Sequence, residues 1–118
     1  MGKQKQQIRT PMYRWWDYVR KIVRAYPVLE ARELNNPDDI KDRDAVAQAI
    51  AETRESQDGA EHIALIRYVY WNPKQHKVRD AAPQCHVSEA TAKRWHGEFI
   101  KAVAKNRGFY VNDTVKLE

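Results

Sequence analysis

The first third of the chain carries a stripe of large apolar residues at helical spacing. It consists of Trp15, Val19, Ile22 and Tyr26, with basic side chains on the opposite side. This spacing predicts an amphipathic helix that begins at Pro11, where Thr10 can cap it. Pro27 lacks the N–H that a helix interior needs, so the helix either ends near Tyr26 or kinks there and continues through residues 28–34.

A second helix is predicted after a break at Asn36 and Pro37. These two residues pair a capping side chain with a proline that suits a first helical turn. Asp38 and Asp39 follow, and the helix dipole favours negative charge at this end. We expect this helix to finish near Gly59.

A third apolar face follows in residues 60–71. Its members are Ile63, Ile66, Val69 and Tyr70. Because they return every three or four residues, they predict a helix. The dipeptide Asn72-Pro73 that comes next is either a further helix start or a loop.

The stretch from Val78 to Trp95 has the layout of a helix-turn-helix. In this motif two helices cross at small residues, a tight turn joins them, an apolar side chain plugs the space beneath the turn, and a polar residue caps the second helix. The matching positions are Ala82 and Ala92 at the crossing, His86 in the turn, Val87 as the plug and Ser88 as the cap. The sequence therefore predicts a recognition helix that starts at Ser88.

The predicted recognition helix has an apolar side and a cationic side. The apolar side, which should face the core, is formed by Ala92, Trp95, Phe99 and Val103. The opposite side carries cations separated by small residues rather than by acids, namely Ala90, Lys93, Arg94, Gly97, Lys101 and Lys105. A solvated helix face without a partner can carry the same residues. The adjoining turn motif favours a DNA major groove as the partner of this row.

Eight residues are candidates for DNA contact: Ser88, Glu89, Ala90, Lys93, Arg94, Gly97, Lys101 and Lys105. Arg94 and Lys93 can donate hydrogen bonds to guanine O6 and N7. Ser88 and Glu89 can contact base edges or phosphates from the first turn of the helix. The two lysines further along are better placed for backbone phosphates.

Two residues complicate the simple motif. Pro83 would cost about 3 kcal/mol inside a helix that began at Val78. Either that helix is kinked, or it starts late, with Asp80 as its cap and Pro83 in its first turn. Gly97 costs about 1 kcal/mol in a helix interior. It marks either close approach of the backbone to a partner, which we favour, or a break in the recognition helix.

The helical pattern over 118 residues predicts an all-α fold of about five helices in a single domain. Residues 1–9 are expected to form a disordered basic arm. Residues 10–108 would form the helical domain, with the helix-turn-helix at about 78–107. Gly108 is expected to close the last helix, and residues 109–118 would form a tail.

The distribution of charge fits a polyanionic partner. Apolar residues make up 42% of the chain and charged residues 31%, which is ordinary for a folded protein. The net charge of +5 divides into +5 over residues 1–34, −4 over residues 35–60 and +4 over residues 61–118. Two basic ends around an acidic middle can place a basic face on one side of a small fold, as nucleic acid binding requires.

The sequence gives little support for a zinc site, an enzyme or a membrane protein. Cys85 is the only cysteine, and together with His86 and the distant histidines it lacks the paired spacing of a zinc site. The chain has no glycine-rich phosphate loop, nucleophile elbow or carboxylate pair beside a base, so we expect neither an enzyme nor a cofactor. No apolar run is long enough to cross a membrane, and we expect a cytoplasmic protein. The aromatic stripe in residues 13–26 could lie on a membrane surface, but such stripes more often face a core.

Residues 63–109 resemble the C-terminal helix-turn-helix of phage late-transcription regulators. The resemblance rests on the string IRYVYW, a short loop and the string AAPQCHVSEATAKRWHGEFIKAVAKNRGF, together with an aromatic-rich helix that ends in AYP near the N-terminus. These regulators are the RinA and ArpU activators and the antitermination Q group, which look like region 4 of sigma factors. Lys77 and Pro83 depart from the family pattern, and this departure concerns the first helix of the motif rather than the second.

The resemblance implies sequence-specific binding to double-stranded DNA and activation of phage or prophage late genes, often with RNA polymerase contact. Two alternatives stay open. In a DNA-packaging small terminase subunit, a similar helix-turn-helix binds packaging DNA while other helices build an oligomer. In a helical adaptor, the basic face would meet an acidic protein. The sequence does not fix the oligomeric state, although a ring in solution would favour packaging, and a monomer or dimer that shifts a promoter fragment would favour transcription.

Overall fold

The computed structural model describes residues 13–109, and the helices in this range match the predicted fold class. The α-helices are α1 (Trp16–Ala31), α2 (Pro37–Arg54), α3 (Gly59–Ile66), α4 (Val78–Ala81) and α5 (Glu89–Arg107). A π-helix, η2 (Arg67–Trp71), extends α3, and a 3₁₀-helix, η3 (Pro83–Cys85), follows α4. The prediction of an all-α fold with about five helices is confirmed.

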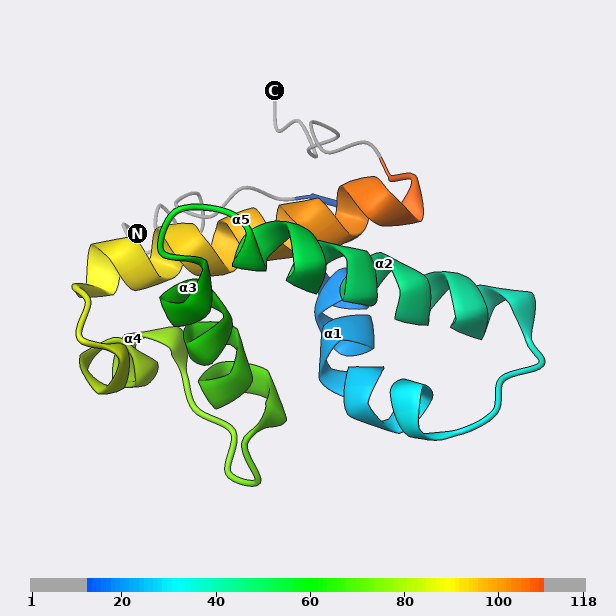
Figure 1. The fold of residues 1–118 in the computed structure, drawn as a ribbon, viewed down its shortest axis with the longest axis horizontal. Coiled ribbons are helices and arrows are strands. Elements are labelled where there is room, and N and C mark those ends of the chain that lie inside the picture. Colours follow the sequence, from blue (N-terminus) through cyan, green and yellow to red (C-terminus); the bar gives the residue numbers. More distant parts are fainter. Residues whose placement is uncertain (1–12, 110–118) are drawn as a thin grey trace, which may run out of the picture.

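Two long helices, α2 and α5, run side by side along the molecule (Figure 1). α1 and the continuous segment of α3 and η2 both pack against this pair. α4 lies against α5 near the N-terminal end of that helix (Figure 1). α5 is therefore supported by every other α-helix of the fold.

One apolar core joins these helices. Its largest fully buried side chains are Val19, Val23, Val46, Leu65, Ile66, Phe99, Ile100 and Val103. Burial of each such side chain stabilises the fold by about 1.5–3 kcal/mol. The stripe predicted for the first helix is confirmed at Trp15, Val19 and Ile22, whereas Tyr26 is only partly buried. The apolar face predicted within residues 60–71 is confirmed at all of its positions.

Pro27 lies inside α1, and the helix continues through it. Because Pro27 has no N–H, it cannot donate to the carbonyl of Val23, four residues earlier. The indole Nε1 of Trp71 donates to that carbonyl instead, at 2.7 Å. Of the two predicted alternatives, continuation past Pro27 is the one observed. α1 begins at Trp16, later than predicted.

α2 starts as predicted but ends earlier. The side chain of Asn36 caps the helix by accepting a hydrogen bond from the backbone N–H of Asp38 at 2.8 Å. α2 ends at Arg54, and Gly59 begins α3 rather than ending α2. A Cβ at Gly59 would clash with the carbonyl oxygens of Thr53 and Arg54. Glycine is thus needed here because the chain turns back tightly against the end of α2.

The dipeptide Asn72-Pro73 forms a loop and not a helix start. The backbone N–H of Lys74 donates to the side-chain oxygen of Asn72 at 3.2 Å, which closes a local turn. The next helix, α4, begins only at Val78. The loop alternative is therefore confirmed.

The C-terminal end of α5 closes at Gly108, as predicted. Gly108 adopts a left-handed conformation with φ of 94°. Its N–H donates to the carbonyl of Lys105 at 3.0 Å, and the N–H of Phe109 donates to that of Ala104 at 2.9 Å. This pair of bonds is a Schellman motif. Phe109, which was predicted to start the tail, packs against Tyr18 with ring centroids 5.9 Å apart.

Several predictions concern residues that the structure does not describe. They are the basic arm at 1–9, the cap formed by Thr10 and Pro11, and the tail residues 110–118. Within residues 13–109, no helix combines the length and the apolar character needed to cross a membrane.

Candidate nucleic-acid interface

The predicted helix-turn-helix is formed by α4, η3 and α5. α4 packs against α5, and the two small residues predicted at the crossing are buried: Ala82 is 2% exposed and Ala92 is 0% exposed. Alanine at both positions lets the helices approach closely. Val87 is partly buried against the core, as expected for the plug beneath the turn.

His86 forms the tight turn between the two helices. Its φ of 58° places it in the left-handed region, where histidine is more frequent than most other residues with a side chain. The backbone N–H groups of Cys85 and Val87 both donate to the carbonyl of Ala82 at 3.1 Å. The turn predicted from the sequence is therefore present and its backbone groups are satisfied.

Ser88 caps the recognition helix. Its backbone is extended, and its Oγ accepts a hydrogen bond from the backbone N–H of Thr91 at 3.1 Å. A serine cap of this kind contributes about 1 kcal/mol to helix stability. α5 thus begins where the sequence predicts it.

Pro83 shortens the first helix of the motif. α4 has only 4 residues and follows Lys77, so the predicted cap at Asp80 is wrong. Pro83 begins the 3₁₀-helix η3, and a kinked α-helix is not formed. Because Pro83 cannot donate to the carbonyl of Arg79, the α-helix ends and the chain continues as the narrower 3₁₀-helix before the turn.

All eight candidate DNA-contacting residues lie on α5 or at its cap. The exposed ones are Ser88, Glu89, Ala90, Lys93, Arg94 and Lys105, and the partly buried ones are Gly97 and Lys101. The predicted apolar side is fully confirmed, since Ala92, Trp95, Phe99 and Val103 are buried. The buried side is wider than predicted, because it also includes Ile100 and Ala104.

The cationic side of α5 is not free of acids, which corrects the sequence analysis. The Nζ of Lys93 lies 2.9 Å from an Oε of Glu89, and the Nε of Arg94 lies 3.7 Å from an Oε of Glu98. Each pair joins residues four positions apart on an exposed helix, where such a contact contributes about 0.2–0.5 kcal/mol. The two cations expected to read bases are therefore held only by weak pairs.

Lys101 has an aromatic neighbour that the sequence analysis did not predict. Its Nζ lies 5.4 Å from the centroid of the Tyr13 ring, a cation–π contact. Tyr13 in turn stacks on Trp15, with centroids 4.6 Å apart. The aromatic residues that precede α1 thus border the cationic side of α5.

Gly97 does not break α5, which runs without interruption from Glu89 to Arg107. A Cβ at Gly97 would meet no atom within 4 Å. Packing inside the described part of the chain therefore does not require glycine at this position.

A polar network joins α5 to α1 and η2. The Nε of Arg20 donates to the hydroxyl oxygen of Tyr70 at 2.9 Å, and this oxygen lies 2.6 Å from the Nε2 of His96. In the tautomer that leaves Nε2 of His96 without a proton, the Tyr70 hydroxyl donates to it while its oxygen accepts from Arg20. The guanidinium of Arg24 lies 5.3 Å from the centroid of the Tyr70 ring. No local sequence pattern indicates this network, because its members come from three separate elements.

The pKa values of His96 and Tyr70 are consistent with a hydrogen bond from the Tyr70 hydroxyl to His96. Burial lowers the pKa of His96 to about 4, and the positive charge of Arg20 adds to the effect. His96 is therefore neutral at neutral pH and can accept the Tyr70 proton. Burial also raises the pKa of Tyr70, although Arg20 and Arg24 oppose the rise. The Tyr70 hydroxyl thus keeps its proton.

His62 supports α5 from α3. Its Nε2 donates to the backbone carbonyl of Trp95 at 2.7 Å, and its ring stacks on the Trp95 indole with centroids 5.2 Å apart. Burial lowers the pKa of His62, so this side chain is neutral at neutral pH. Among residues 13–109, no cluster of His, Cys, Asp and Glu side chains could hold a metal ion.

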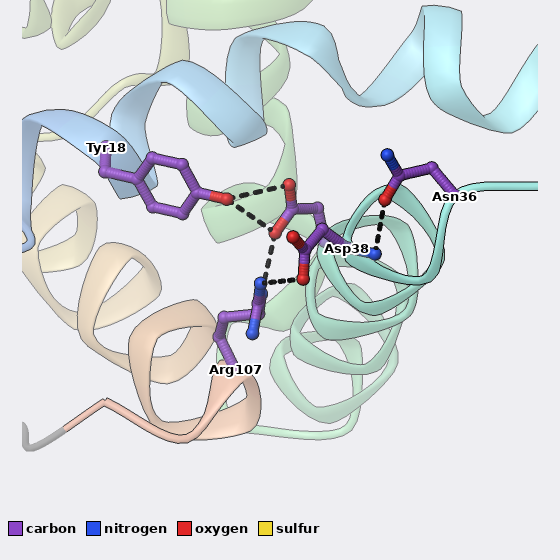
Figure 2. Close-up of polar contacts among 5 residues, drawn as sticks. Tyr18, Asn36, Asp38 and Arg107 are labelled. Carbon is purple, nitrogen blue, oxygen red and sulfur yellow. Dashed lines mark hydrogen bonds and ion pairs between the residues drawn. The ribbon is translucent and has the colours of Figure 1, made fainter.

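The C-terminal end of α5 is anchored by a charged network (Figure 2). The Nε of Arg107 donates to an Oδ of Asp42 at 2.7 Å, and its Nη2 lies 3.5 Å from an Oδ of Asp38. The Tyr18 hydroxyl donates to Asp42 at 3.0 Å. The hydrogen bond to Asp42 raises the pKa of Arg107. The network ties α5 to α1 and α2, and the sequence analysis did not predict it.

We compared the chain with family models, curated proteins and solved structures. None of these comparisons gives a match. The geometry of α4 and α5 is therefore the main basis for a functional proposal. α5 offers an exposed side with several cations, a capped N-terminal end and contacts with every other α-helix of the described residues.

Proposed function

We propose that this chain is a sequence-specific DNA-binding protein that regulates the transcription of phage or prophage late genes. The observation that carries the proposal is the pairing of α4 with a Ser88-capped α5 across the left-handed turn at His86. In this arrangement the N-terminal half of α5 enters the major groove of double-stranded DNA. The late-gene role rests on the resemblance of residues 63–109 to phage regulators, and it implies action in the cytoplasm with RNA polymerase as a partner.

Base reading is assigned to Arg94 and Lys93. On DNA, these side chains leave their glutamate partners and donate to guanine O6 and N7. Little free energy is lost when a cation leaves its glutamate, because each exposed pair contributes only about 0.2–0.5 kcal/mol. A good bidentate contact with a base then contributes about 1–3 kcal/mol of discrimination against the wrong base. Ser88 and Glu89 contact the DNA from the first turn.

Backbone binding is assigned to Lys101 and Lys105, which lie further along α5. Their charges neutralise phosphates and fix the register of the helix in the groove. Gly97 lies between the two sets of cations. Its missing side chain lets the DNA approach the helix backbone, which accounts for a glycine that packing does not require.

The test is a selection of bound fragments by the purified full chain from a random DNA library and from a library of the source genome. We expect one enriched motif, and an affinity that falls linearly with the logarithm of salt concentration. A folded chain that binds no DNA at low salt would refute the proposal. A ring-shaped oligomer that binds the selected DNA would redirect the function from transcription to packaging.

Two substitutions separate base reading from backbone binding. Arg94→Ala is expected to relax the preference at one base position by about 5- to 150-fold, equivalent to 1–3 kcal/mol. Lys101→Ala should weaken binding to every DNA sequence and lower the salt slope by about one. Lys41→Ala removes an exposed cation from α2 and serves as the control, with affinity and preference unchanged.

A further inference from the structure

A groove on another part of the molecule is lined by α1, α2, α3 and η2. Its volume is about 480 Å³, within the range of known ligand and side-chain pockets. Apolar surface is supplied by Tyr26, Pro27, Ile50, Ile63 and Trp71, and the other lining residues are charged. None of the eight candidate DNA-contacting residues lines it, so the proposed reading of DNA does not account for it.

Two departures from regular α-helix meet at this groove. Pro27 lies inside α1, where it removes a helix hydrogen bond. Arg67 and Trp71, which also line the groove, are the first and last residues of the π-helix η2. Short π-helical segments are rare and occur frequently at functional sites. Both irregularities are stabilised together, because the Trp71 indole donates to the carbonyl that Pro27 leaves without its helix partner.

The hydrogen bond of Trp71 determines what the groove offers to an occupant. Its Nε1 is already bonded to the Val23 carbonyl at 2.7 Å, and its ring lies 5.7 Å from that of Tyr26. The indole therefore presents carbon surface rather than a donor. An occupant of the groove must bring a large apolar group.

The rim of the groove is cationic. Arg54 and Arg67 line it and are exposed, and in the described part of the chain neither guanidinium forms an ion pair or a hydrogen bond. Glu30 is the one acid among the lining residues. Burial and, next, the negative charge of Glu30 raise the pKa of Tyr26, whereas Arg43 and Arg54 oppose the rise. The rim is thus complementary to carboxylates.

We propose that this groove binds a peptide segment of a partner protein in which a large apolar side chain is flanked by acidic residues. An apolar centre with a charged, exposed rim is the usual anatomy of a protein interface. The apolar side chain packs on Trp71 and Tyr26, and the acidic residues pair with Arg54 and Arg67. A small-molecule site would instead need polar groups that converge inside the pocket, whereas Glu30, Arg54 and Arg67 are exposed and the Trp71 donor is already in use.

One side-chain contact connects the groove to α5. The Trp71 ring contacts Phe99 of α5 edge-on, with centroids 6.5 Å apart. A partner seated on Trp71 therefore lies one side chain away from the buried side of the proposed recognition helix, and it leaves the exposed side free. The peptide site does not depend on DNA binding and can be tested separately.

The test is a selection of displayed random 12-residue peptides on the immobilised full chain. The library is first depleted on the double variant Arg54→Glu/Arg67→Glu, which removes peptides that bind the basic side of α5. We expect the enriched peptides to carry an aromatic or large aliphatic residue with Asp or Glu on both sides. Synthetic versions should bind the double variant at least tenfold more weakly than the original chain. The matched control Lys74→Glu/Arg79→Glu, which reverses two exposed cations outside the groove, should change affinity less than twofold.

The position of the bound peptide is read from the indole N–H resonance of Trp71, identified by its loss in Trp71→Phe. We expect saturable shifts of this resonance with the selected peptide in ¹⁵N-labelled chain. Failure to enrich peptides, or equal binding to the double variant with an unfolding transition like that of the original chain, would overturn the proposal. So would a saturable shift with 3-phenylpropionate alone when no peptide binds, because this result would assign the groove to a small carboxylate. If the double variant does not fold, Arg54→Gln/Arg67→Gln replaces it with the same expected direction.

Discussion

The two ends of α5 differ in whether their ion pairs are exposed or buried. Near the N-terminal end, Lys93 and Arg94 pair with glutamates of the same helix, and all four side chains are more than half exposed. Near the C-terminal end, Arg107 pairs with Asp42 of α2, and these side chains are 14% and 8% exposed. One end therefore keeps its cations available to a partner, and the other end uses a cation to hold the helix in place.

Exposure to water determines how much the ion pairs at each end contribute to the stability of the fold. Exposed pairs are screened and contribute little to stability. A buried pair gives little net stability over an apolar replacement, but removal of one member leaves a charge that is buried without its partner. We therefore expect substitutions along α5 to separate into two groups, those that alter DNA binding and those that alter folding.

The largest effect is expected for Asp42→Ala. This change leaves Arg107 without its closest partner and the Tyr18 hydroxyl without its acceptor. The free energy of unfolding should fall by about 3–5 kcal/mol, measured by urea denaturation. Lys93→Met, at the exposed end, is the matched control and should change it by no more than about 0.5 kcal/mol. Equal losses in the two variants would show that the ends do not differ.

A smaller loss of stability is expected on acidification. The folded pKa of His96 is about 4 and its ordinary value is 6.5, so the unfolded chain binds the proton more readily. The free energy of unfolding should therefore fall as the pH drops from 6.5 to 4, by up to about 3 kcal/mol at 1.36 kcal/mol for each pH unit. His62 acts in the same direction.

The variant His96→Gln isolates the His96 contribution. Glutamine keeps an acceptor for the Tyr70 hydroxyl but does not titrate. Urea denaturation at several pH values should give a flatter profile for this variant between pH 6.5 and 4. A profile as steep as that of the original chain would mean that other groups cause the acid sensitivity.

Local features of the fold were predictable from the sequence. Ser88, His86 and Gly108 were placed correctly because caps and tight turns depend on residues a few positions apart. The apolar side of α5 followed from helical periodicity alone. The predicted end of α2 is wrong, because glycine often ends a helix, whereas at Gly59 it avoids a clash with the carbonyls of Thr53 and Arg54.

The polar networks were not predictable in the same way. Arg107 and Asp42 are 65 residues apart in the chain, and Tyr70 and His96 are 26 apart. No local pattern indicates such partners, because the packing of the helices decides which side chains meet. The pair of Lys93 and Glu89 differs, since its spacing of four was visible in the sequence.

The glycine in the middle of α5 allows a further distinction between folding and binding. Gly97→Ala adds a methyl group where no atom lies within 4 Å, so the free energy of unfolding should rise by about 1 kcal/mol from helix propensity. If the helix backbone lies against DNA at this position, affinity for the selected DNA should fall in the same variant. A gain in stability with unchanged affinity would remove Gly97 from the interface. Gly59→Ala, which forces a Cβ against two carbonyls, should instead destabilise the fold.

The smallest effect on folding and the clearest test of the exposed end come from Glu89→Gln. The change frees Lys93 and removes a negative charge from the first turn of α5, so the free energy of unfolding should fall by less than about 1 kcal/mol. Binding to non-specific DNA should become tighter and its salt dependence steeper, because one more cation is available to phosphate. Glu33→Gln removes one exposed acid elsewhere in the chain and controls for net charge. If both variants tighten binding equally, overall charge and not the pairing on α5 governs the interaction. If Glu89→Gln tightens non-specific binding while it weakens binding to the selected motif, Glu89 itself contacts a base, as a carboxylate that accepts from cytosine N4 would.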